Sequence, residues 1–277
     1  MRVDPRKGKL VRVLEEDPAL AEQLPPDVRV RAISEAVAYS YSSPRRVETE
    51  HMMIDGAPGD LGVLLLDGYI GSVTELSGRR TLELLGPGDL ARPWELRRDG
   101  ETRIDVTMTV AVIERIRWVL LDANFARIAG AWPELIASLM HRACERSRWQ
   151  SLYAAATLLP RLQDRLLIQL WLTADRWGRV TPHGVVVPIR MTLTQLAAMA
   201  HARRPSVSTA MTTLKTRGMV ARTESGGWCL RPAAAAFVSQ FSVKSPAEQA
   251  VRSAAAAAAR LSNVGGLSRL HPEESFP

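Results

Sequence analysis

The spacing of apolar positions divides the chain into a strand-rich first part and a helix-rich second part. Between about residues 30 and 120, glycines at turn spacing separate short apolar runs, which are Gly62–Leu66, Tyr69–Val73, Thr81–Leu85 and Val106–Ile113. Many short strands with regular turns are typical of a β-roll or barrel. Ser77 and Gly78 predict a hairpin turn between two of these strands.

The residues before these strands, 1–27, are interpreted as an N-terminal arm with one short helix. Asp17 is a suitable N-cap residue, and Pro18 fits the first helical position. We therefore expect a helix from Asp17 to about Leu24.

The segment between Pro133 and Ala156 has no interrupting glycine or proline, and its apolar residues recur at helical spacing. This pattern predicts a long amphipathic helix, whose apolar face needs a partner surface. A second copy of the helix is the economical partner, and packing on the chain's own β domain is the alternative. The predicted dimer contacts are Leu135, Ile136, Leu139, Met140 and Ala143.

A helix-turn-helix is the most specific pattern in the chain. A helix is expected from Leu162 to Arg176, and a strand from Val185. Thr192 and Gln195 then match a capping box, which opens a helix with Leu196, Met199 and Ala200 on one face.

After a turn at His201–Arg203, Pro205 suits the first position of a second helix. That helix carries Val207, Ala210, Met211 and Leu214 at helical spacing and ends at Gly218.

The other face of the second helix suits DNA, because it offers short polar groups and one arginine with no acidic residue. Arg204, at the start of the helix, is placed to bind guanine O6 and N7, while hydroxyl groups suit phosphates. A predicted hairpin from Met219 to Arg231 follows as a wing, where Arg222 would meet the DNA backbone. The predicted DNA-binding residues are Thr192, Thr194, His201, Arg203, Arg204, Pro205, Ser206, Ser208, Thr209, Thr212, Thr213, Lys215 and Arg222.

The positive charge of the chain is concentrated in this same region. The formal net charge of the 277 residues is +7, yet residues 160–232 alone hold eleven basic and three acidic residues. A nearly neutral domain joined to a basic one indicates a sensor with a DNA reader, since basic surfaces favour anionic partners.

Localisation is predicted from what the sequence lacks. The two cysteines are too few for a disulfide framework, and no secretory signal or membrane-length apolar run is seen. These observations predict a cytoplasmic protein with no membrane partner.

The run from Leu193 to Val220 resembles the DNA-binding motif of the Crp/Fnr family of bacterial regulators, and it reads LTQLAAMAHARRPSVSTAMTTLKTRGMV. The order of β-roll, long helix and winged helix is also similar to that family over about residues 10–232. The resemblance implies an α+β fold and a homodimer on a near-palindromic operator. It places the base-reading positions at Arg204, Pro205 and Thr209, and it leaves RNA polymerase open as a further partner.

The expected domains are a β-roll sensor with an N-terminal helix at 1–130, a dimerisation helix at 131–157 and a winged helix-turn-helix at 158–235. A flexible alanine-rich tail is expected at 236–277.

The sensor half departs from the cyclic-nucleotide binders of the family. Gly86–Leu90 matches the turn before their phosphate cassette, but Arg92 and Pro93 stand where Gly-Glu is expected, and Ile104 follows Arg103 instead of Ser or Thr. Binding of cAMP is therefore disfavoured, and an unidentified effector stays open. The candidate effector residues are Gly88, Asp89, Arg92, Trp94 and Arg103, with a solvated loop as the alternative.

No enzyme chemistry is predicted. The histidines are scattered, and neither a metal-ligand spacing nor a Ser/His/Asp set is found. Cys144 is expected to be a buried apolar residue, the alternative being an exposed redox thiol. Two other hypotheses remain: a DNA-binding regulator that needs no effector, and a ligand-binding or enzymatic β-roll, for which His51 is the one histidine of the β region.

Overall fold

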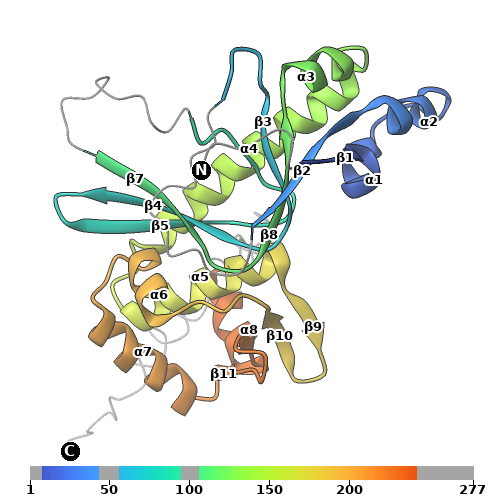
Figure 1. The fold of residues 1–277 in the computed structure, drawn as a ribbon. Helices are drawn as coiled ribbons and strands as arrows, with labels where there is room; N and C mark the ends of the chain where they lie inside the picture. Colours follow the sequence, from blue (N-terminus) through green and yellow to red (C-terminus); the bar gives the residue numbers. More distant parts are fainter. Residues whose placement is uncertain (1–7, 44–55, 95–105, 242–277) are drawn as a thin grey trace, which may run out of the picture. The chain divides into compact units, whose positions relative to one another are not determined.

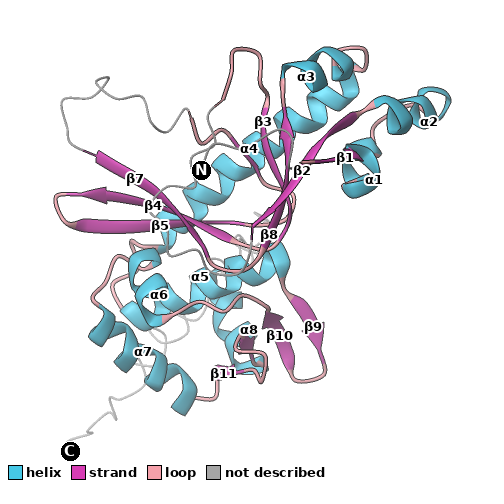
Figure 2. Cartoon of the chain, viewed as in Figure 1, coloured by secondary structure: helices cyan, strands magenta, loops and turns pink. Residues whose placement is uncertain are grey.

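The computed structural model describes residues 8–43, 56–94 and 106–241. The chain up to Ala235 forms one compact unit, and the residues from Ala236 onwards form a second. Within the first unit, strands predominate before residue 122 and helices after it (Figure 2). His51, Arg103 and most of the predicted tail lie outside the described residues.

Two antiparallel sheets build the N-terminal domain, which we call the sensor domain after its predicted role (Figure 1). The five-stranded sheet has the order β1 (Lys9–Arg12), β2 (Val37–Ser43), β8 (Ile116–Leu121), β3 (Gly62–Asp67) and β6 (Leu90–Ala91). The three-stranded sheet has the order β5 (Arg79–Leu85), β4 (Ile70–Leu76) and β7 (Val106–Val112). These sheets confirm the predicted β-roll.

Strand β3 is apolar along most of its length because both of its faces are buried. Leu64 belongs to the hydrophobic cluster beneath the helices of the sensor domain. Val63 and Leu65 point the other way, into a second cluster that includes Trp118. Since neighbouring side chains of a strand point to opposite faces, a strand between two cores needs an unbroken apolar run.

The hairpin turn between β4 and β5 lies where it was predicted. Ser77 and Gly78 have φ angles of 50° and 72°, the left-handed pair that a tight hairpin requires.

The N-terminal helices differ from the prediction. Residues after Asp17 form only a short 3-10 helix, Pro18–Ala21, next to α1 (Val13–Glu16). A longer helix that was not predicted, α2 (Pro26–Glu35), occupies the region assigned to strands from residue 30. Only Ala32 is buried among its residues, so the segment lacks a continuous apolar stripe that periodicity could detect.

The long helix is confirmed as α4 (Pro133–Ala156), which follows α3 (Ala123–Ala129). Leu135 and Leu139, two of the predicted dimer contacts, instead pack into the core of their own sensor domain. Met140 is 60% exposed, and Ala143 is also exposed. Among the described residues, no helix is both long and apolar enough to cross a bilayer.

The C-terminal region is a winged helix-turn-helix. Its helices are α5 (Leu162–Trp177), α6 (Leu193–Met199) and α7 (Arg204–Thr216), followed by α8 (Pro232–Val238). The sheet has the order β11 (Val220–Arg222), β12 (Trp228–Leu230), β10 (Gly184–Val187) and β9 (Arg179–Thr181). The wing is thus the outer hairpin of a four-stranded sheet rather than a separate ribbon.

The predicted capping box opens α6. Thr192 Oγ1 accepts a hydrogen bond from the backbone N–H of Gln195 at 3.2 Å, and Gln195 Oε1 accepts one from the backbone N–H of Thr192 at 2.8 Å. Two N–H groups that α6 leaves without intrahelical partners are therefore bonded.

We predict that Thr192→Ala destabilises α6 by about 1 kcal/mol, because the cap is lost while the fold is kept. Amide hydrogen exchange over Leu193–Met199 measures this cost. Thr212→Ala is the control, since its hydroxyl group bonds a carbonyl group inside α7 and caps nothing. Unchanged exchange in Thr192→Ala would contradict the stabilising role of the cap.

Candidate nucleic-acid interface

Helices α6 and α7 hold the recognition surface through a small apolar core. Leu196 and Met199 of α6 are buried with Val207, Met211 and Leu214 of α7, as the sequence predicted. The turn between the helices contains His201 with a φ angle of 51°. Pro205 is the second residue of α7 rather than the first, because Arg204 already begins the helix.

The outer face of α7 is exposed and carries no carboxylate. Arg203 precedes the helix as its N-cap residue, and both Arg203 and Arg204 are exposed. Exposed side chains continue along the helix at Pro205, Ser206, Ser208, Thr209, Thr212, Lys215, Thr216 and Arg217. This face can approach phosphates without electrostatic repulsion.

The threonines of this face are bonded to their own helix. Thr209, Thr212, Thr213 and Thr216 each donate a hydroxyl hydrogen bond to the carbonyl oxygen four residues earlier, at 3.0–3.3 Å. Such bonds fix the rotamers of these side chains.

A tryptophan of the wing, Trp228 in β12, orders two of the predicted DNA-binding cations. The guanidinium carbon of Arg222 lies 4.4 Å from the ring centroid of Trp228, and Lys215 Nζ lies 5.4 Å from it. Arg222 also donates a hydrogen bond to the carbonyl oxygen of Met191. These contacts bring the end of α7 and the wing together as one basic surface. Sequence reasoning missed Trp228, because nothing in its neighbours reveals the stacking.

Of the predicted DNA-binding residues outside α7 and the wing, those at the start of α6 are exposed, whereas His201 contacts the sensor domain. Thr192 and Thr194 are exposed at the start of α6. His201 is also exposed, but its Nε2 forms a hydrogen bond of 2.9 Å with Thr81 Oγ1 of strand β5. His201 thus joins the helix-turn-helix to the sensor domain.

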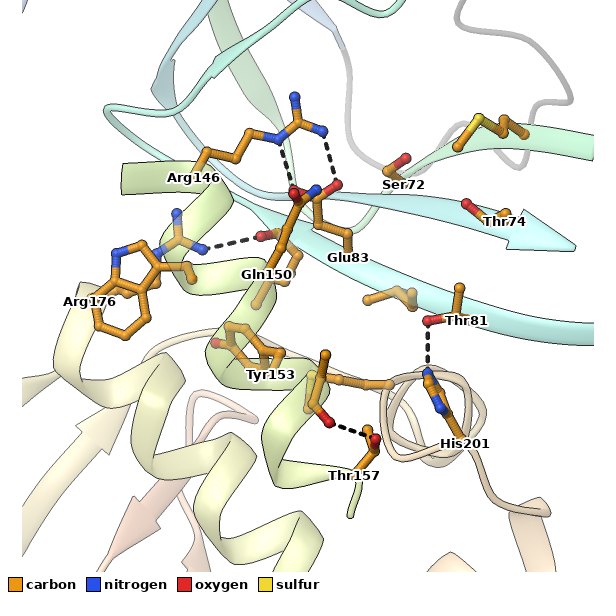
Figure 3. Close-up of a pocket in the computed structure, with 16 residues that line it drawn as sticks. Ser72, Thr74, Thr81, Glu83, Arg146, Gln150, Tyr153, Thr157, Arg176 and His201 are labelled. Atoms are coloured by element: carbon orange, nitrogen blue, oxygen red, sulfur yellow. Dashed lines mark hydrogen bonds and ion pairs between the residues drawn. The ribbon is translucent and has the colours of Figure 1, made fainter. Parts of the chain in front are cut away.

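A cavity of about 290 Å³ lies beside this contact (Figure 3). Hydroxyl groups of Ser72, Thr74 and Thr81 line it from β4 and β5. Helix α4 contributes Arg146, Trp149, Gln150 and Tyr153, whereas Arg176, Met199 and His201 come from the DNA-binding domain. The cavity is thus bordered by both domains.

The charged groups of this cavity are paired. Arg146 donates two hydrogen bonds to the carboxylate of Glu83, at 2.7 and 2.8 Å, which raise the pKa of Arg146. Arg176 forms an ion pair with Asp89. Burial raises the pKa of Asp89, and the attraction of Arg176 opposes that rise. Burial also raises the pKa of Tyr153 to about 12, which keeps its phenol neutral.

The four candidate effector residues that the structure describes, Gly88, Asp89, Arg92 and Trp94, do not line this cavity. Asp89 is buried and bonded to Arg176, while Gly88 faces Arg142. Arg92 lies over the ring of Trp94, with its guanidinium carbon 5.8 Å from the centroid.

Cys144 is exposed on α4, so the expectation of a buried residue was wrong. The helix pattern placed Cys144 beside Ala143, and the structure leaves both side chains exposed on α4. Cys229 is the buried cysteine.

Comparison with known proteins gives a domain and a fold. Residues 161–233 match the family of Crp-like helix-turn-helix domains. A search of curated proteins finds no match.

Solved structures show the same fold at low identity. FixK2 from Bradyrhizobium japonicum is 18% identical with a TM-score of 0.53, over 70% of this chain and 92% of its own. A cyclic nucleotide-binding domain containing protein from Listeria monocytogenes is 14% identical with a TM-score of 0.55, over 70% and 89%. A CooA mutant from Carboxydothermus hydrogenoformans is 15% identical with a TM-score of 0.50, over 69% and 82%. The chain thus contains a Crp-like helix-turn-helix domain and shares the fold of these solved structures, which agrees with the resemblance found in its sequence.

Proposed function

We propose that the protein is a sequence-specific transcription regulator that binds a palindromic operator as a homodimer. The observation that carries this proposal is the exposed face of α7, where Arg204 and hydroxyl groups meet no carboxylate and the cations of the wing lie at one end. This function is non-enzymatic and belongs in the cytoplasm. RNA polymerase enters the proposal only through the resemblance to the family.

The dimer contact is proposed on the middle of α4. Met140 and Ala143 are exposed there, and together with Ile136 and Leu139 they line an apolar groove between α4 and the sensor domain. A large exposed apolar side chain on a long helix supports contact with a second copy, because oligomers of one chain mostly pair equal surfaces.

An effector is proposed for the cavity of Figure 3, and its class is an uncharged molecule with a planar ring. Both guanidinium groups at the cavity already hold carboxylates, so an anionic ligand would meet no free positive charge there. Trp149, Met108 and Met199 supply apolar walls, and Gln150 and the hydroxyl groups supply polar contacts. A cavity with both polar and apolar walls favours this regulator over one that needs no effector.

We predict that Arg204→Ala lowers the discrimination between the operator and mismatched DNA by about 1–3 kcal/mol, because a bidentate contact to guanine is lost. Selection from genomic fragments by the wild-type protein first identifies the operator, and mobility shifts then compare the variants. Arg31→Ala is the matched control, since Arg31 is an exposed arginine on α2 in the sensor domain. Failure of the wild-type protein to enrich any sequence would refute the proposed function.

Arg222→Ala is expected to weaken binding to all DNA sequences about equally, because we assign Arg222 to the phosphate backbone rather than to base edges. The slope of log affinity against log salt concentration should fall by about one unit. Titration of a fixed duplex at several salt concentrations measures the slope. A change confined to the operator would instead assign base reading to Arg222.

Cyclic AMP at millimolar concentration is expected to leave the melting temperature of the protein unchanged. A ligand that binds the native state raises the melting temperature, but the cavity presents its phosphate with no unpaired cation. Differential scanning fluorimetry with cAMP and with uncharged adenosine measures both cases. A rise with cAMP alone would disprove an uncharged effector class.

A further inference from the structure

The end of α5 is fixed to one turn of the sensor domain by Arg176. This side chain forms the ion pair with Asp89 and donates a hydrogen bond of 3.3 Å to the carbonyl oxygen of Leu84. Its guanidinium carbon also lies 3.8 Å from the ring centroid of Trp177 and 5.4 Å from that of Trp149. One side chain therefore contacts the sensor turn, helix α4 and its own helix.

The ion pair is shielded from water. The side chains of Arg176 and Asp89 are each 8% exposed, and Asp89 Oδ2 also accepts the backbone N–H of Gly86 at 2.9 Å. Shielded charges attract each other more strongly than exposed ones, and loss of one partner leaves the other buried without compensation. This contact thus favours one arrangement of the two domains.

Trp177 adds a shape-dependent contact to the same turn. Its Nε1 donates a hydrogen bond of 3.2 Å to the carbonyl oxygen of Pro87, and its ring meets the edge of Tyr69 at a centroid distance of 5.4 Å. A Cβ atom on Gly86 would lie 2.8 Å from the Trp177 ring and 2.7 Å from Tyr69. Glycine at position 86 is therefore what allows the two surfaces to meet.

Backbone hydrogen bonds and one side-chain bond connect both sides of this contact to the rest of their domains. On the sensor side, the backbone N–H of Gly88 donates a hydrogen bond to the carbonyl oxygen of Leu65, and the N–H of Leu65 donates one to the carbonyl oxygen of Asp89. On the other side, Gln169 of α5 donates a hydrogen bond of 2.9 Å to the carbonyl oxygen of Met199 in α6. Displacement of Arg176 would thus be passed to the helix-turn-helix.

We propose that Arg176 is a positioning residue for operator recognition: it fixes the DNA-binding domain on its own sensor domain, and so sets the separation of the two recognition helices in the homodimer. We call Arg176, Asp89, Trp177 and Gly86 the Arg176 clamp. The proposal rests on the proposed function, since it assumes a homodimer on a palindrome.

The physical reason is the cost of bringing a second recognition helix into place. Once one half-site is bound, the second binds at an effective concentration that is high only if the geometry matches the spacing of about one helical turn. A loosened clamp spreads the DNA-binding domain over many positions and lowers this effective concentration. The contact of one α7 with one half-site is left unchanged.

Two variants open the clamp by different means. Arg176→Gln removes the charge and the stacked guanidinium group. Gly86→Ala leaves every charge in place but inserts a methyl group against Trp177, and Gly86 has no positive φ that alanine would strain.

Each variant has a matched control. Arg29→Gln removes a partly buried arginine of α2 that donates hydrogen bonds of 3.0 and 2.8 Å to the carbonyl oxygens of Glu22 and Leu24, within the N-terminal helices. Gly130→Ala adds a methyl group whose nearest neighbour is 3.4 Å away.

The DNA experiment compares the selected full operator with its single half-site in duplexes of equal length. Both clamp variants should bind the full operator about tenfold or more weakly than the wild type, while half-site affinity changes less than about twofold. A misfolded variant would lose both affinities, so retained half-site binding shows that the domain is folded. Equal loss on both duplexes, or no loss on either, overturns the proposal.

A second measurement needs no DNA and separates this proposal from the proposed function. Spin labels at Ser77→Cys and Thr216→Cys, in a Cys144→Ser background diluted with unlabelled protein, report the distance between the two domains. The distribution should be narrow in the wild type and both controls, and broad in Arg176→Gln and Gly86→Ala. A narrow distribution in the clamp variants overturns the proposal, even if no operator is ever selected.

Discussion

The buried ion pair of Asp89 and Arg176 constrains the rest of this structure. Removal of water from the two charged groups costs free energy, and their mutual attraction about offsets that cost. The pair therefore adds little to the free energy of unfolding. It penalises every arrangement in which the two groups are separated but still buried. The turn at Gly86–Asp89 must stay on β3, and α5 must stay on that turn. The cavity of Figure 3 has its shape because these elements do not move apart.

Much of the fold could be predicted because the deciding signals are local. The capping box of Thr192 and Gln195 spans three positions, the turn at Ser77 and Gly78 spans two, and the run in β3 lies within one strand. The errors arose where packing partners decide the outcome. Helical spacing showed that one face of α4 needs a partner, but it could not show that Leu135 and Leu139 contact their own sensor domain while Cys144 stays exposed. Helix α2 has one buried residue and so left no periodic signal.

The exposed cations of the candidate site could be predicted from the sequence, but the contacts that hold them could not. Charge and helix position were sufficient to select Arg204, Lys215 and Arg222, which the structure places on exposed surfaces. The ring of Trp228 under two of these cations was not predictable, and neither was the bond from His201 to Thr81, which lies 120 positions away. The cavity proposed for an effector is assembled from β4, β5, β7 and helices α4, α5 and α6, a combination that no single stretch of sequence reveals.

The hydroxyl bonds along α7 have a consequence for what this helix presents to a base pair. Each threonine that gives its hydrogen to a backbone carbonyl group keeps only oxygen lone pairs for a neighbour. In the major groove, the hydrogen-bond donors that match such lone pairs are the amino groups of adenine and cytosine. In the proposed complex with DNA, the surface beyond Arg204 is therefore complementary to amino groups, and an operator that suits it has its guanine at the end of each half-site that faces the start of α7.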